Sequence, residues 1–261
     1  MSPNVSVGDR EVALAGTILR GEVGSGAHGM AIVGTDDRDE MGVYVETPEQ
    51  VLGLAPATGH YVSRTQPEGV RSGPGDLDLV LYSLHKFLRL ATAGNPTVLT
   101  MLYLPRYDVL DARGELLLAA RDAIVSRRAG RRYLGYLDGQ RERMLGRGKQ
   151  SHVPYRPELI ERFGYDTKYA SHALRLGLQG VELMSTGMLT LPMAAADLAA
   201  CREVKTGQVD RAEAMRRVDE ARARLADLLE GAVAVPDEPN LARVNEVMCA
   251  VQVTTWGWQR S

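Results

Sequence analysis

The chain has 261 residues, with 31 Lys and Arg against 33 Asp and Glu and therefore a formal net charge of −2. Hydrophobic residues make up 44% and charged residues 25%, which excludes a disordered or fibrous chain and leaves one large domain or two smaller ones. No apolar run reaches the roughly 18–20 residues of a membrane helix, no secretory h-region is present, and the cysteines number 2. We therefore expect a soluble, cytoplasmic protein with no membrane partner.

Strands are expected in the first hundred residues and helices after them. Residues 17–23, 42–46 and 77–81 have β-branched or alternating patterns. From about residue 82 the apolar residues recur with the period of a helix, which predicts an α+β fold rather than an alternating βαβ chain. After a first helix that buries Leu84, Phe87, Leu88 and Ala91, helices are expected at residues 96–103, 113–124, 126–146, 157–163, 166–186, 194–206, 208–231 and 238–253.

A glycine-rich turn, GSGAHG over residues 24–29, directly follows the first expected strand. Its glycines let backbone N–H groups approach an anion closely, and the hydroxyl of Ser25 can add one hydrogen bond. The turn is therefore a candidate phosphate site beginning at Gly24. A simple reversal of the chain is the alternative interpretation.

Two acidic residues follow this turn at a spacing of two. In an extended segment Asp37 and Asp39 project to one side, and Arg38 turns away. Converging carboxylates repel one another unless a cation lies between them, and Mg²⁺ or Mn²⁺ binds through such groups together with substrate phosphates. This predicts an anion site beside a metal site, as an in-line displacement at phosphorus requires. Solvated loop carboxylates are the alternative.

These two motifs resemble the signature of the DNA-polymerase-β-like nucleotidyltransferases, a GS turn followed by D-x-D on the next strand. More narrowly, the chain is similar to a bacterial and phage family of predicted nucleotidyltransferases linked to RNA repair. Residues 24–29 and 35–43 fit its first two motifs, although Thr35 and Asp36 stand where Ser is usual.

Two further stretches fit the same family. DLVLYSLHKFL at residues 78–88 precedes a GNP turn, and GYDTKYASH occupies residues 164–172. The resemblance thus spans about residues 17–190. Thr100 departs from it, because an acidic residue often stands there in the family, and about 70 C-terminal residues carry no recognised motif.

The resemblance implies three metal ligands, the third on a strand antiparallel to that of Asp37 and Asp39. Asp78 is the expected third ligand, because the family pattern places an acid directly before the Y-S-L-x-K helix. It would also accept the proton of the attacking hydroxyl. Asp76, which shares a strand face with Asp78 at a spacing of two, is the alternative third ligand. Another interpretation is that Asp76 belongs to a turn formed by residues 73–76.

The helix expected from residue 166 has Asp166 at its N-cap and a polar arc formed by Lys168, His172, Arg175, Gln179 and Glu182. A solvent-exposed face is one interpretation of this arc. The other is phosphate binding, with His172 donating a hydrogen bond or relaying a proton. The predicted nucleotide-binding residues are Gly24, Ser25, Lys168, His172 and Arg175, with Lys86 and Arg89 as a second candidate pair.

A basic segment interrupts the slightly acidic sequence. Residues 121–149 contain nine Arg and Lys against three Asp and Glu, a local charge of +6. Such a segment is either a solvated helical face or a surface that faces phosphates.

We therefore predict an α+β protein with a small mixed or antiparallel nucleotidyltransferase core at residues 1–108 and a helical domain at 109–261 that covers the cleft. The resemblance implies transfer of an NMP from an NTP such as ATP to an acceptor hydroxyl, with Mg²⁺ or Mn²⁺ held by Asp37, Asp39 and Asp78. The expected acceptor is a nucleic-acid 3′ end, such as that of tRNA or another RNA. A protein adenylyl- or uridylyltransferase and a catalytically silent nucleotide-binding module are the alternatives.

Overall fold

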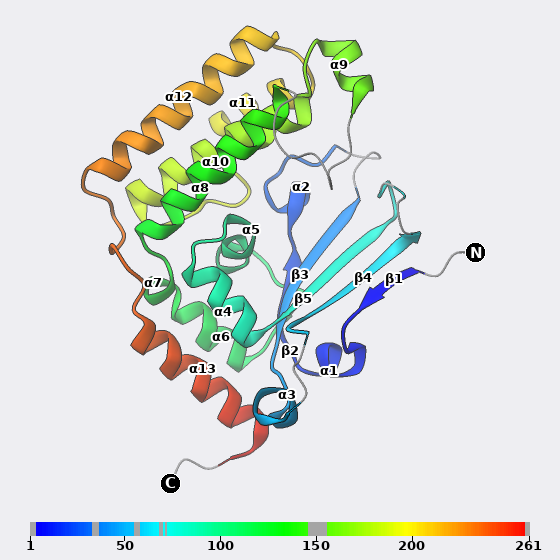
Figure 1. Ribbon diagram of the computed structural model, residues 1–261, viewed down its shortest axis with the longest axis vertical. Helices are drawn as coiled ribbons and strands as arrows, with labels where there is room; N and C mark the ends of the chain where they lie inside the picture. The colour runs from blue at the N-terminus through cyan, green and yellow to red at the C-terminus, as the bar shows by residue number, and fades with distance from the viewer. Residues whose placement is uncertain are drawn as a thin grey trace. The chain divides into compact units, whose positions relative to one another are not determined.

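The chain divides into two compact units in the computed structural model. The first comprises residues 1–92, 97–124 and 239–261, and the second 93–96 and 125–238. The first holds the sheet and the second is helical, which confirms the predicted α+β class (Figure 1). The assignment of a nucleotidyltransferase core to residues 1–108 and of a helical domain to residues 109–261 remains a prediction. The residues that the structure describes are 4–32, 37–54, 58–67, 70, 72–145 and 156–258.

The sheet has six strands in the order β1-β4-β5-β3-β2-β6. All neighbours are antiparallel except β3 and β5. A parallel pair needs a crossover connection, which here runs through α3 (Pro48–Leu52) and β4. The strands are β1 (Asn4–Val7), β2 (Thr17–Glu22), β3 (Arg38–Tyr44), β4 (His60–Pro67), β5 (Leu77–Ser83) and β6 (Val109–Leu110).

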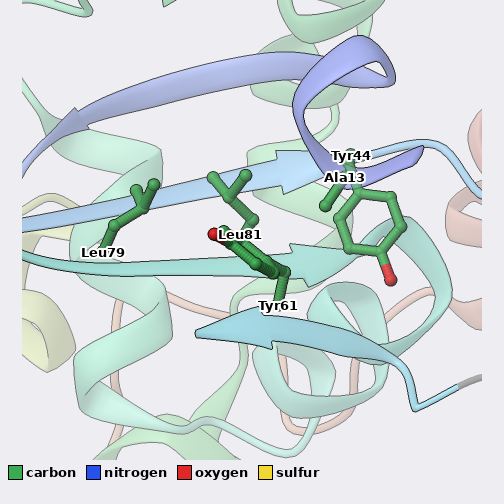
Figure 2. Packing of buried hydrophobic residues seen from close by; sticks show 5 residues of the cluster. All are labelled: Ala13, Tyr44, Tyr61, Leu79 and Leu81. Carbon is green, nitrogen blue, oxygen red and sulfur yellow. The ribbon is translucent and has the colours of Figure 1, made fainter. Parts of the chain in front are cut away.

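One face of the sheet is covered by α1 (Arg10–Ala15), a helix that the sequence did not predict. Its Ala13 packs into a buried cluster with Leu79 and Leu81 of β5, and two tyrosines of neighbouring strands complete this cluster (Figure 2). Because successive side chains of a strand point to opposite faces, Asp78 and Val80 project to the other side of the sheet. The acidic residue of β5 is thus kept apart from the apolar core beneath α1.

The helix α4 (Leu84–Thr92) follows β5 directly and packs against β3 and β5. It buries the predicted apolar face, Leu84, Phe87, Leu88 and Ala91. In Figure 1 it lies on the side of the sheet opposite to α1. Further helices outside the second unit's bundle are α5 (Pro96–Leu99), η1 (Thr100–Tyr103, a 3₁₀ turn), α6 (Ala112–Ala119), α7 (Arg121–Ile124) and α13 (Leu241–Trp256).

Two of these elements correct the predicted boundaries. The single helix expected at residues 113–124 is interrupted at Ala120, which caps α6 before α7 begins. The helix expected to end near Tyr103 changes to 3₁₀ geometry in its last turn, as helix C-termini commonly do.

The second unit is built around α10 (Thr167–Thr186), which contacts all four of its other helices. A Cβ on Gly177 would lie 2.7 Å from that of Ala221 on α12, so glycine at this position permits close helix packing. The other helices are α8 (Arg127–Met144), α9 (Pro157–Phe163), α11 (Ala195–Lys205) and α12 (Arg211–Glu230). Within the described ranges, no helix is both long and apolar enough to cross a bilayer.

This packing corrects one interpretation of the polar arc on α10. Lys168 is exposed, but His172 and Arg175 are half-buried and Gln179 is only 2% exposed. The arc is therefore not a simple solvent-exposed face, because neighbouring helices cover much of it. Asp166 caps the helix as predicted and accepts hydrogen bonds from the N–H groups of Lys168 and Tyr169.

Candidate functional site

Three carboxylates converge at the beginning of β3 and β5. Asp39 and Asp78 are register partners on these adjacent strands, and Asp37 immediately precedes β3. One oxygen from each of the three lies within 4.8 Å of the others, and all three residues are half-buried. The structure thus brings together the three acids that the sequence analysis selected.

The strand that carries Asp78 runs parallel to β3, whereas the resemblance implied an antiparallel arrangement. That expectation is wrong for this chain, because the crossover through α3 and β4 returns the chain in the direction of β3. The parallel pairing still places Asp39 directly beside Asp78, since register partners on neighbouring strands share a face.

The opposite face of β3 carries paired charges. Arg38 lies 2.8 Å from Glu40 and 3.2 Å from Asp108, and Glu40 is also 3.5 Å from Arg20. Arg38 therefore points away from Asp37 and Asp39, as strand alternation predicts.

Asp78 accepts hydrogen bonds at both carboxylate oxygens. Nε2 of Gln66 donates to Oδ1 at 2.9 Å, and Oγ of Ser72 donates to Oδ2 at 3.1 Å. Nε of Arg64, the register partner of Asp78 on β4, lies 3.7 Å from Oδ1. These neighbours were not predicted from the sequence, because β4 was not predicted. Only the pairing of β4 with β5 could have indicated Arg64 and Gln66, and Ser72 lies in the connection between these strands.

Asp76 has a different environment. Its carboxylate accepts hydrogen bonds from Oγ1 of Thr65 at 3.0 Å and from the N–H of Gly73 at 2.9 Å. Its own N–H donates to the carbonyl of Gly73, which closes a turn. Asp76 thus stabilises the turn that precedes β5. The third carboxylate of the group is that of Asp78 and not that of Asp76.

The glycine-rich turn forms a single helical turn, α2 (Gly24–Ala27), that packs against β3 (Figure 1). Gly24 has a φ of +63°, and a Cβ there would lie 2.1 Å from Oδ2 of Asp39. The N–H of Val23 also donates to the carbonyl of Asp39 at 2.9 Å. Glycine is therefore required at position 24 both by the backbone conformation and by the close approach of Asp39.

The predicted phosphate ligands Lys168, His172 and Arg175 all lie on α10 in the second unit. The pKa of His172 is lowered to about 3, chiefly because burial disfavours the charged ring. His172 is therefore neutral at pH 7, which favours a hydrogen-bonding role over a proton relay. The positive groups that further lower this pKa are, in decreasing order, Arg175, Lys168, Arg156 and Lys205.

The second candidate pair is not brought to the carboxylates. Lys86 lies beyond the far end of β5, and the five steps from Asp78 to Ser83 correspond to about 17 Å at ~3.3 Å per residue. Its Nζ is 2.8 Å from Nδ1 of His60, and burial lowers its pKa, with a further contribution from Arg89. Arg89 is exposed on α4.

Some arginines of the basic segment form ion pairs within the protein, and others are exposed without an ion pair to the described residues. Arg127 binds Asp237 at 2.6 Å and two backbone carbonyls at 2.8 Å, and Arg141 binds Asp219 at 2.7 Å. Arg128 pairs with Glu238. Arg131 and Arg132 are exposed on α8, and neither forms an ion pair with the described residues. Two further members of the segment, Arg147 and Lys149, lie outside the described residues.

The mixed sheet, the helical turn at Gly24 and the three adjacent carboxylates define a nucleotidyltransferase fold of the DNA polymerase β type. Residues 9–235 match the family described as the RNA repair pathway DNA polymerase beta family (RlaP). The chain belongs to this family, which confirms the resemblance found in its motifs. No match to a curated protein was found.

Proposed function

We propose that this protein is a metal-dependent nucleotidyltransferase that moves an NMP from an NTP to an acceptor hydroxyl and releases pyrophosphate. The observation that carries the proposal is the convergence of Asp37, Asp39 and Asp78 within 4.8 Å beside the turn at Gly24. Like charges at such separations repel, and a divalent cation is the ordinary means of relieving that repulsion.

The three carboxylates fit Mg²⁺ or Mn²⁺. Hard cations of this kind prefer carboxylate oxygens, and two oxygens bound to one Mg²⁺ at about 2.1 Å lie at most about 4.2 Å apart. Small side-chain rotations would bring the observed oxygens to that separation. When bound, the cation would polarise the transferred phosphoryl group and neutralise developing charge.

The residues of the first unit have separate roles in this proposal. The N–H groups of the turn and the hydroxyl of Ser25 bind the β- and γ-phosphates. A carboxylate offers about four acceptor positions, and Gln66 and Ser72 occupy two of those on Asp78. Positions therefore remain for a cation and for the proton of the attacking hydroxyl. Catalysis is then mostly positioning and electrostatic stabilisation.

We further propose that Lys168, His172 and Arg175 bind phosphate groups of the NTP or of the acceptor. The positive groups that surround His172 support this role, because they depress its pKa and would attract an anion. A neutral imidazole can donate one hydrogen bond to a phosphate oxygen.

The proposed acceptor is an RNA 3′ end. Two observations support it: the family is associated with an RNA repair pathway, and Arg131 and Arg132 are exposed on α8. Exposed arginines can neutralise backbone phosphates of a nucleic acid without reading its sequence.

The test is incubation of the protein with each labelled NTP, Mg²⁺ or Mn²⁺, and either purified RNA or a protein lysate. Label in RNA at the 3′ end is the expected result. Label in protein would replace the RNA acceptor by a protein hydroxyl while retaining the reaction. If no NTP gives label in either fraction, the proposed activity is wrong and a silent nucleotide-binding module takes its place.

A further inference from the structure

Gln66 and Ser72 form a closed hydrogen-bonded ring with the carboxylate of Asp78. Nε2 of Gln66 donates to Oδ1 of Asp78 and to Oγ of Ser72, and the Ser72 hydroxyl donates to Oδ2 of Asp78. Each of the three donor hydrogens has one acceptor, so both oxygens of the carboxylate are fixed in direction.

The orientation of the Gln66 amide is determined by this ring. A flipped amide would place Oε1 against Oδ1 of Asp78 and remove the donor to Ser72. In the observed orientation Oε1 is buried, and no described residue donates a hydrogen bond to it. Because Gln66 is only 6% exposed, leaving this oxygen unpaired is unfavourable. The hydrogen bonds to Asp78 and Ser72 therefore determine the orientation of the Gln66 amide.

A glutamine at this position is not needed to hold the strands together. The backbone pairing of β4 with β5 already fixes Arg64 opposite Asp78, and Gln66 follows Arg64 at a spacing of two, on the same face. The amide therefore acts on the side chain of Asp78 rather than on the sheet. Residues that orient a metal-binding carboxylate in this way commonly change metal affinity when they are replaced.

We propose that Gln66 and Ser72 are positioning residues that hold the Asp78 carboxylate in the orientation required to bind the divalent cation with Asp37 and Asp39. This inference rests on the proposed function, since it assigns a role at the same site. As proposed, neither residue contacts substrate or the reacting atoms. Both act through Asp78.

The test measures binding of Mn²⁺ alone to the full chain by electron paramagnetic resonance, without substrate. Gln66→Met keeps the side-chain volume but removes the donors, and we expect it to weaken Mn²⁺ binding by about 10–100-fold. Ser72→Ala should weaken binding less, and Ser72→Thr, which keeps the hydroxyl, should restore it. The Ser72 variants carry the test if Gln66→Met fails to fold.

The matched control is Gln50→Met, which removes the same amide from the capping box of α3. It should lower the melting temperature and leave Mn²⁺ affinity unchanged. In an Asp78→Ala background, Gln66→Met should cause no further loss, because residues that act through one group are not additive.

Unchanged Mn²⁺ affinity in both Gln66→Met and Ser72→Ala would overturn the inference and leave the proposed function intact. An equal loss from Gln66→Met with and without Asp78 would also overturn it, since the effect would then not pass through this carboxylate. If the wild-type protein binds no Mn²⁺, the proposed metal-dependent function fails and the inference fails with it.

Discussion

On one face of β3, Arg38 lies between Glu40 and Asp108, whereas on the other face Asp37 and Asp39 converge with Asp78. The first arrangement pairs each acid with a base and is complete within the protein. The second places three acids together, with Arg64 no nearer than 3.7 Å to Asp78. The acids of the first face are thus paired with arginines within the protein, whereas the three acids of the second face form a group that could hold a divalent metal ion.

The greatest loss of activity should follow the removal of one of the three converging carboxylates. Asp39→Ala should reduce kcat/KM by at least about 10³-fold, or roughly 4 kcal/mol of transition-state stabilisation. The metal-free protein should remain folded, with an unchanged or higher melting temperature, because repulsion is relieved. Asp37→Ala should behave in the same way.

The control for this experiment is Asp76→Ala, which removes a nearby carboxylate that belongs to a turn. It should cost stability but retain most of the activity per folded molecule. If Asp39→Ala turns over NTP at the wild-type rate in Mg²⁺, the carboxylate of Asp39 is not needed for catalysis.

A second prediction separates binding from catalysis at Asp78. Asp78→Asn keeps the shape of the side chain, and we expect kcat to fall by about 10²–10³-fold with little change in the KM for NTP, because the role of the carboxylate grows in the transition state. Steady-state kinetics over NTP concentration measure both constants. A raised KM at constant kcat would make Asp78 peripheral.

Gly24→Ala disturbs the group of three carboxylates without altering its charge. The new Cβ would meet Oδ2 of Asp39 and would force alanine into a positive φ, at a cost of about 1–2 kcal/mol or more. Thermal unfolding should show the destabilisation, and Mn²⁺ titration should show weaker binding. Gly75→Ala, where φ is also positive but a Cβ meets nothing within 4 Å, separates backbone strain from displacement of Asp39.

A smaller effect is expected from the exposed arginines of α8. Replacing Arg131 and Arg132 together with Ser should flatten the dependence of log K for single-stranded RNA on log salt by about 1.4, or roughly 0.7 per lost phosphate contact. Arg127→Ser should instead reduce stability, because Arg127 binds Asp237 and two carbonyls. Equilibrium binding at several salt concentrations distinguishes the two. An unchanged slope in the double variant would remove α8 from the RNA-binding surface.

The sequence predicted the helices of the second unit well because a 3.6-residue apolar period is a local property. It also predicted Asp37 and Asp39 as a pair, since strand alternation relates neighbours two apart. Neither β4 nor α1 was predicted: His60–Pro67 has no clean alternation of buried and exposed residues, and α1 is a helix of only 6 residues.

The surroundings of Asp78 could not be predicted for a different reason. Gln66 reaches Asp78 only because β4 pairs with β5 in one particular register, and Ser72 reaches Asp78 from the connection between these two strands. Strand pairing is determined by tertiary packing rather than by local sequence. The same limit explains why the direction of β5 relative to β3 was expected wrongly.

The parallel register of β3 and β5 also makes the geometry of the site depend on correct strand alignment. A slip of one residue between these strands would bring Leu77 or Leu79 opposite Asp39 and turn Asp78 toward the core beneath α1, since a one-residue shift moves every side chain to the other face. Only a correctly aligned sheet therefore presents all three carboxylates to one point. If the three carboxylates bind a divalent cation as proposed, titration with that cation would measure the fraction of molecules with native strand alignment, which the overall helix content does not report.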